Sequence, residues 1–274
     1  MSTGNPEREY VLGTDDAEIA RLSLQHSVWR ADAAAAWQRA GFAPGQSIVD
    51  VGCGPGFATL DLAELVGARG RVLAVDQSER FLAHLRQMAA AHSLEKSVET
   101  MTADVTAMSL PARQFDGAWI RWVLSFVNEP RAVIASVAAA LKPGGVVVLQ
   151  EYCDYRAWKF FPRDPEHEEY VAEVIASWRK RGGDPDIGFA LPVLLREAGL
   201  EVRHVRSLSD IVRPGSPRWE WAMAFATTGM QRLVQTGDVS RETGDRLTGA
   251  IGRIASSGQL MMIPTVAEVI AVAP

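Results

Sequence analysis

Residues 48–59 read Ile-Val-Asp-Val-Gly-Cys-Gly-Pro-Gly-Phe-Ala-Thr, and this stretch decides the fold. A β-branched run leads into three glycines at alternate positions, Gly52, Gly54 and Gly56, and a helix-favouring stretch follows at once. A strand that turns this sharply into a helix needs residues without a Cβ, so that the backbone can bend and approach a ligand closely. The free N–H groups at the helix start attract an anionic group. The stretch therefore predicts a ligand-binding loop between a strand and a helix.

Strand-like and helical patterns alternate along the chain that follows. Strands are expected at 48–51, 71–75, 98–102, 115–120 and 146–150, and helices at 57–66, 78–92 and 131–141. Such alternation is typical of a parallel sheet with helices on both faces. The second run ends at Asp76, 20 residues after Gly56, where an α/β nucleoside site places a carboxylate for the ribose hydroxyls.

Five features in order resemble the class I S-adenosylmethionine-dependent methyltransferases. They are the glycine loop, the acid Asp50 before it, Asp76, Asp104 after the third strand, and the turn Leu141-Lys142-Pro143-Gly144-Gly145. The resemblance covers residues 42–150 well and the last strands loosely. It implies S-adenosyl-L-methionine as the cofactor and S-adenosyl-L-homocysteine as the product.

The resemblance also implies a fold. We expect an α/β architecture with a Rossmann-like seven-stranded, mostly parallel sheet, helices on both faces and a helical lid. Runs at 200–207 and 260–272 match the antiparallel last strand pair of that family. The expected division is an N-terminal helical lid at 1–41, a cofactor-binding core at 42–150, a helical lid insertion at 151–199, and the last core strands at 200–274 with a helical insertion at 217–257.

The cofactor site is expected to draw on several strand ends. By resemblance, the glycine loop and Asp50 hold the methionyl end, Asp76 holds the ribose and Asp104 accepts from the adenine amino group. Arg121 and Trp122 touch the methionyl group and sulfonium, where an aromatic face is electrostatically favourable. Each assignment has a structural alternative: a tight turn for the glycine loop, a helix cap for Asp76, an exposed turn acid for Asp104 and a core residue for Trp122. The full expected set is Tyr10, Asp50, Gly52, Cys53, Gly54, Gly56, Asp76, Gln77, Asp104, Val105, Arg121 and Trp122.

Catalysis by in-line displacement at a sulfonium methyl depends mainly on alignment, and a base is needed only if the acceptor loses a proton. His26 is one candidate base, because an unperturbed histidine titrates near neutrality. Its alternative role is that of an interior histidine whose ring nitrogens are hydrogen-bonded within the protein. Glu151 is the other candidate, and its alternative role is to accept hydrogen bonds from backbone. The expected acceptor pocket comprises Gln25, Trp29, Tyr155 and Trp158.

Composition excludes several classes of partner. The 274 residues are 47% hydrophobic with a net charge of −5, which gives no electrostatic footprint for nucleic acid or an anionic membrane. Cys53 and Cys153 form neither metal spacing nor a disulfide framework, and we expect no metal. The first residues do not read as a signal peptide, so a cytoplasmic protein is expected. A homodimer is compatible with the sequence.

The sequence thus predicts a methyltransferase for a small apolar or aromatic metabolite, with oxygen slightly favoured as the acceptor atom. A nicotinamide-dependent oxidoreductase is disfavoured, because its G-x-G-x-x-G fingerprint requires glycine where Phe57 stands. A regulator or partner protein that binds the cofactor without catalysis stays open. A methyltransferase of macromolecules is the third alternative, disfavoured by the acidic charge and the bulky lid.

Overall fold

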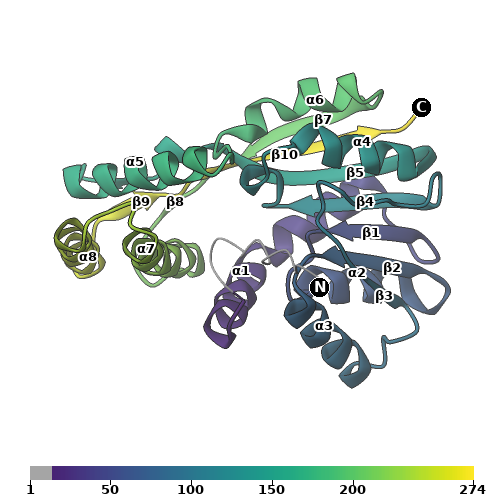
Figure 1. The fold of residues 1–274 in the computed structure, drawn as a ribbon, viewed down its shortest axis with the longest axis horizontal. Coiled ribbons are helices and arrows are strands. Elements are labelled where there is room, and N and C mark those ends of the chain that lie inside the picture. The colour runs from purple at the N-terminus through teal and green to yellow at the C-terminus, as the bar shows by residue number, and fades with distance from the viewer. Residues whose placement is uncertain (1–13) are drawn as a thin grey trace, which may run out of the picture.

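The computed structural model describes residues 14–274, and its larger sheet has seven strands (Figure 1). Their order is β3-β2-β1-β4-β5-β10-β7. The first five pair in parallel, whereas β10 runs antiparallel to both of its neighbours, β5 and β7. The predicted mostly parallel sheet is confirmed. The bounds are β1 Ser47–Val51, β2 Arg71–Asp76, β3 Val98–Thr102, β4 Phe115–Arg121, β5 Leu141–Asp154, β7 Glu201–Leu208 and β10 Thr265–Val272.

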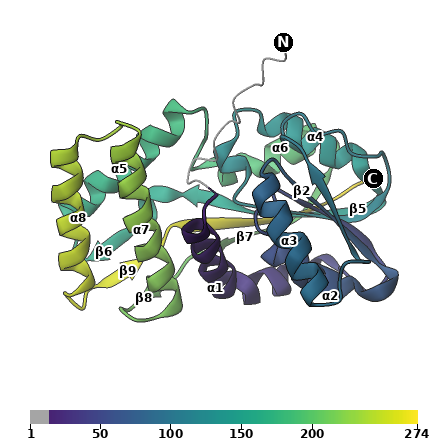
Figure 2. The ribbon, with the colours of Figure 1, turned by 60° about the horizontal axis from the view of Figure 1, so that its bottom comes forward.

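Helices cover both faces of this sheet (Figure 2). α1 and α2 share one apolar cluster with the sheet, and α4 and α6 share another on the opposite face. Trp37 on α1 meets Trp119 on β4 edge to face at 5.3 Å, which fixes α1 against the sheet. The bounds are α1 Asp16–Ala40, α2 Phe57–Val66, α3 Glu79–Ala91, α4 Pro130–Ala140 and α6 Leu191–Glu197.

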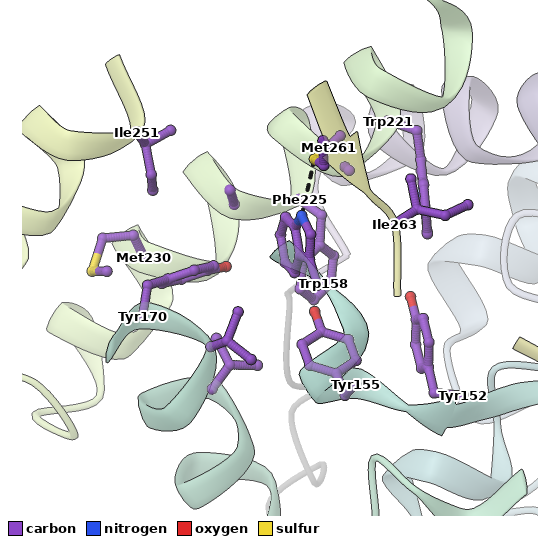
Figure 3. Close-up of a cluster of buried hydrophobic side chains, with 14 of the residues drawn as sticks. Tyr152, Tyr155, Trp158, Tyr170, Trp221, Phe225, Met230, Ile251, Met261 and Ile263 are labelled. Atoms are coloured by element: carbon purple, nitrogen blue, oxygen red, sulfur yellow. Dashed lines mark hydrogen bonds between the residues drawn. The ribbon is translucent and has the colours of Figure 1, made fainter. Parts of the chain in front are cut away.

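A second part of the molecule lies beyond one end of the sheet and has its own aromatic core (Figure 3). Three helices pack there with a three-stranded sheet in the order β6-β9-β8. In that core Trp158 Nε1 donates to Met261 Sδ at 3.0 Å. The bounds are β6 Lys159–Phe161, β8 Ile211–Val212, β9 Leu260–Met262, α5 Pro165–Lys180, α7 Pro217–Gln235 and α8 Arg241–Ala255.

The predicted segments differ from the structure in three places. α6 was expected in the lid insertion 151–199, but Leu191 and Leu195 bury their side chains against the main sheet, so α6 belongs to the core. The small sheet was not expected, because strands of two or three residues are too short to show a period. β5 also continues to Asp154, four residues past the expected strand end at 150. Within residues 14–274, no helix is both long and apolar enough to cross a bilayer.

His167 on α5 makes the second part of the molecule sensitive to acid. Among the described residues neither of its ring nitrogens has a hydrogen-bond partner, and its ring lies 4.9 Å from that of Trp158 and 4.6 Å from that of Phe160. Burial lowers the pKa of His167 to about 4, whereas an unfolded histidine titrates near about 6.5. The unfolded chain therefore binds more protons between these values, and stability falls as the pH is lowered through that window.

We expect this histidine to remove about 3 kcal/mol of unfolding free energy as the pH falls from about 7 to about 4. The variant His167→Phe keeps a flat ring in the aromatic core and is expected to abolish that part of the loss. Urea unfolding of both proteins at the two pH values measures it. The same pH dependence in the variant and the wild type would contradict a buried neutral imidazole.

Candidate cofactor and acceptor site

A cavity of about 470 Å³ lies at the carboxyl ends of the central strands. Its wall combines the loop after β1, the ends of β2 and β4, helix α1 and one residue of α7, Phe225. This is the crevice in which open α/β sheets bind their ligands. Ligand pockets in proteins have volumes of about 300–1,000 Å³, so the cavity suits a small-molecule site.

The glycine loop has the backbone that the sequence predicted. Gly52, Gly54 and Gly56 have φ values of 68°, 55° and 87°, a region that L side chains rarely adopt. A Cβ at Gly56 would overlap the side chain of Leu85, and one at Gly52 would overlap Val123. The loop therefore depends on glycine for its conformation and for close packing. Gly52 and Gly54 line the cavity, whereas Gly56 caps α2 behind it.

Asp76 joins the loop to the end of β2. One carboxylate oxygen accepts from Gly54 N at 2.8 Å and the other from Ser78 N at 2.8 Å. The side chain is half-buried and lines the cavity, and burial raises its pKa although these hydrogen bonds lower it. A carboxylate has lone pairs beyond the two used here, so Asp76 can still accept from ligand hydroxyls.

The other residues expected at the adenosine end also line the cavity. These are Gln77, Asp104 and Val105, and Cys53 of the glycine loop lines it too. Asp104 is exposed, and one of its oxygens accepts from Thr106 N at 2.9 Å and from Thr106 Oγ at 2.7 Å. Its second oxygen accepts no hydrogen bond from residues 14–274, which leaves an acceptor for an amino group of a ligand. Tyr10 lies outside the described residues.

Asp50 and Arg121 form the polar floor of the cavity. Asp50 is 2% exposed and accepts from Thr59 Oγ at 2.6 Å, and burial raises its pKa to about 6. Arg121 is half-buried, and the desolvation of its guanidinium lowers its pKa to about 10 despite nearby carboxylates. Arg121 Nη1 has no hydrogen-bond partner among residues 14–274. An unpaired buried guanidinium nitrogen is costly, so this wall fits a ligand that brings a carboxylate, as S-adenosylmethionine does.

Trp122 lines the same wall with an unusual backbone. Its φ is 52°, which is rare for a bulky residue and is typical of constrained functional sites. Its ring stacks between Tyr152 at 5.6 Å and Trp221 at 5.8 Å, with interplanar angles of 24° and 18°. Trp122 therefore contributes both to the cavity and to the aromatic core behind it.

His26 lines the cavity, but both of its ring nitrogens have partners. Nε2 lies 3.0 Å from Asp61 Oδ2, and Nδ1 lies 3.0 Å from Arg121 Nη2. Burial lowers the pKa of His26, although the hydrogen bond to Asp61 opposes this. A general base needs a free lone pair that points at the substrate. The arrangement does not provide one, contrary to the expected catalytic role.

Glu151 is fully buried and does not line the cavity. Its two oxygens accept from Val123 N and Leu124 N at 2.8 Å each, and from Ser125 N at 3.2 Å and Ser125 Oγ at 2.8 Å. These donors form the turn into the 3-10 helix η2, Leu124–Phe126. Burial raises the pKa of Glu151 to about 7 against these hydrogen bonds. The expected catalytic role is therefore wrong in this structure, and Glu151 fixes backbone instead.

The expected acceptor pocket is only partly right. Gln25 lines the cavity, and its Oε1 accepts from Trp221 Nε1 at 3.1 Å. Trp29, Tyr155 and Trp158 are at most 1% exposed and belong to the aromatic core. They were expected in the pocket because large rings in a lid either line a cavity or fill a core, and the sequence does not separate these cases.

Several wall residues were not predicted. Phe225 on α7, Phe126 after β4 and Arg181 also line the cavity. Asp61 contacts His26, but nothing in the sequence distinguishes it from an ordinary surface acid of an amphipathic helix. Within residues 14–274, no group of three or more His, Cys, Asp or Glu side chains is placed to hold a metal ion.

Comparisons with known proteins agree with this geometry. Residues 48–145 match the family model described as a methyltransferase domain. The chain is 33% identical over 127 residues to a demethylmenaquinone methyltransferase of Lactococcus lactis, which covers 46% of this chain and 49% of that protein. It is 25% identical over 225 residues to a ubiquinone/menaquinone biosynthesis C-methyltransferase of Shewanella pealeana, which covers 74% of this chain and 87% of that protein.

The fold also matches a solved structure, that of geranyl diphosphate C-methyltransferase from Streptomyces coelicolor. The TM-score is 0.61 with 14% sequence identity, and the match covers 99% of this chain and 86% of that chain. At this identity the likeness concerns the fold alone. The chain spans about half the length of the Lactococcus relative and most of the length of the Shewanella one.

Proposed function

This chain belongs to the class I S-adenosylmethionine-dependent methyltransferases, and we propose that it methylates a small, flat and largely apolar metabolite in the cavity described above. The observation that carries the proposal is the hydrogen bond from Gly54 N to Asp76 Oδ2 in the cavity wall. It places the strand-end carboxylate beside the glycine loop, and these are the two features with which α/β sites bind a ribose and an anionic group.

The residues divide into two ends of one cavity. Asp76 and Asp104 are proposed to hold the adenosine part. The loop backbone is proposed to hold the methionyl end, with Arg121 at its carboxylate. The bound cofactor supplies an electrophilic methyl group on a sulfonium sulfur. The protein's part is to align the acceptor with that methyl group and to exclude water, which are the two effects that accelerate a displacement of this kind.

The acceptor end is lined by rings. Trp122, Phe126 and Phe225 present aromatic surface, while Gln25 and Tyr152 add polar atoms. Such a wall favours a planar acceptor with one or two oxygen substituents. The names of the relatives point to quinone rings and to carbon as the methylated atom, and on that ground we favour carbon over the oxygen acceptor expected from the sequence.

The acceptor proposal is tested with methyl-labelled S-adenosylmethionine and a panel of reduced quinones, phenols and aliphatic alcohols. Transfer to hydroquinones or phenols, with the site of methylation read by mass spectrometry and NMR, supports the proposal. Label that appears in protein or RNA of a cell extract contradicts a small acceptor. Tight cofactor binding without transfer to any acceptor would favour a regulator or partner protein. A lid role for the helices, a cytoplasmic location and a homodimer stay predictions.

A further inference from the structure

The guanidinium of Arg121 lines the cavity, and one of its two terminal nitrogens has a hydrogen-bond partner. Its Nη2 lies 3.0 Å from His26 Nδ1, and the rings of Trp119 and Trp122 lie 5.5 Å and 5.2 Å from its central carbon. Its Nη1 is buried without a hydrogen-bond partner among residues 14–274, and the side chain lines the cavity. The arginine is therefore held from the His26 side, and its Nη1 donor is left unsatisfied beside the cavity.

His26 is fixed in turn from its far side. Asp61 Oδ2 lies 3.0 Å from His26 Nε2, and Arg30 Nε and Nη2 hold the Asp61 carboxylate at 2.7 Å and 2.8 Å. A carboxylate can only accept, so the proton of the neutral imidazole resides on Nε2. Nδ1 is then the acceptor for Arg121. The result is a chain of hydrogen bonds from exposed Arg30 through Asp61 and His26 to Arg121 in the cavity wall.

We propose that His26 and Asp61 are positioning residues that aim Arg121 at the carboxylate of the cofactor's methionyl group. The inference rests on the proposed function, since it takes the cofactor to be S-adenosylmethionine. Asp76 ends β2 on one side of β1, and Arg121 ends β4 on the other side. A nucleoside whose ribose contacts Asp76 thus extends its other end across the glycine loop toward Arg121. In S-adenosylmethionine and S-adenosylhomocysteine that end carries the carboxylate, for which arginine is the preferred partner.

The positioning depends on a neutral imidazole. Protonation of His26 turns Nδ1 into a donor that faces the guanidinium, so the subsite is complete at neutral pH and is lost as the pH falls. Burial already lowers the pKa of His26, and the charge of Arg121 lowers it further, against the effect of Asp61. The charge of Asp50 on β1 acts on the same guanidinium, and burial raises the pKa of Asp50 to about 6, so Asp50 also contributes to the pH dependence. Asp32 and Arg30 on α1 and Tyr152 on β5 are the other groups that act on His26 or Arg121.

The test compares two ligands that differ in the methionyl end. S-adenosylhomocysteine carries the amino acid end with its carboxylate and amino group, whereas 5′-methylthioadenosine has the same adenosine and sulfur but ends in a methyl group. Calorimetric titration of the full chain at neutral pH is expected to show that His26→Phe and Arg121→Met each lower the affinity for S-adenosylhomocysteine about tenfold or more, as for loss of one charge-assisted hydrogen bond. The affinity for methylthioadenosine is expected to stay within about twofold, which also shows that the site is folded.

Two further variants sharpen the result. His84→Phe is the matched control. The rings of His26 and His84 lie 6.1 Å and 5.9 Å from that of Phe57, but of the two histidines only His26 hydrogen-bonds to Arg121. It is expected to leave both affinities unchanged. His26→Gln keeps an acceptor that does not titrate, so it is expected to retain most of the preference for S-adenosylhomocysteine. In wild type, both His26 and Asp50 make the affinity for S-adenosylhomocysteine depend on pH. In His26→Gln only the contribution of Asp50 is expected to remain.

Each outcome has a clear meaning. If His26→Phe loses affinity equally for both ligands, or for neither, the positioning role is overturned while the cofactor assignment stands. A wild-type protein that binds neither ligand overturns the cofactor assignment itself, and the inference with it. A preference for S-adenosylhomocysteine that persists unchanged in Arg121→Met shows that another group holds the carboxylate, which also overturns the inference.

Discussion

Replacing Asp76 by alanine is expected to lower the affinity for S-adenosylhomocysteine about a hundredfold or more. The carboxylate accepts from Gly54 N and Ser78 N, and it is proposed to accept from the ribose hydroxyls as well. Hydrogen bonds to a charged group are worth about 1.5–3 kcal/mol each. The variant loses two such bonds to the ligand and releases Gly54 from the conformation that the loop needs. Isothermal titration calorimetry of both proteins measures the difference.

The matched control is Asp116→Ala at the opposite end of the sheet. Asp116 accepts from Ser47 N at 2.8 Å and from Lys142 Nζ at 2.7 Å, so its loss also frees a backbone N–H and a side-chain donor. It lines a different hollow, near the amino ends of the strands. We expect Asp116→Ala to lower the melting temperature without changing cofactor affinity. A similar loss of affinity in both variants would mean that Asp76 acts through stability alone.

Replacing Glu151 by alanine is expected to lower the free energy of unfolding by about 4 kcal/mol. Three backbone N–H groups and one hydroxyl would lose their acceptor in a fully buried place, and unsatisfied buried donors cost about 1–3 kcal/mol each before relaxation. The same turn holds Trp122 at a φ of 52°. That strained backbone persists only where its surroundings enforce it, so the cavity wall should loosen as well. Urea unfolding monitored by tryptophan fluorescence measures the change.

Two comparisons separate this structural role from catalysis. Glu197→Ala removes an exposed acid that pairs with Arg131, and such surface pairs contribute about 0–1 kcal/mol. Glu151→Gln keeps the shape but places an amide among donors, so it is expected to lie between wild type and Glu151→Ala. If Glu151→Ala unfolds like wild type and yet fails to transfer methyl groups, the carboxylate acts on the acceptor after all.

The parts of the fold that the sequence predicted are those that follow from local chemistry. The loop after β1 was predictable because three alternate residues in it have positive φ, two of them against packed side chains, and few residues other than glycine tolerate this. The strands around it were predictable because buried parallel strands read as short apolar runs. The antiparallel last pair, β7 and β10, followed only from the resemblance to a family.

The parts that the sequence did not predict depend on contacts between distant segments. His26 was assigned as a base because no local signal shows that Asp61 and Arg121 occupy both of its nitrogens, 35 and 95 residues away. Glu151 was assigned similarly, although its partners are backbone groups 26 to 28 residues away in the sequence. Trp158 was placed in the pocket because burial in a second core is set by the packing of three helices that form separately along the chain.

The measurement that tests the account most directly is a titration of the wild-type protein with S-adenosylmethionine, S-adenosylhomocysteine and NAD. Thermal unfolding and calorimetry report the binding. A ligand that binds only the folded protein adds about 2.7 kcal/mol of stability at a hundredfold excess over its Kd. We predict stabilisation by both adenosyl compounds and none by NAD, with the effect lost in Asp76→Ala. Stabilisation by NAD alone would contradict the assignment of the glycine loop and of the function built on it.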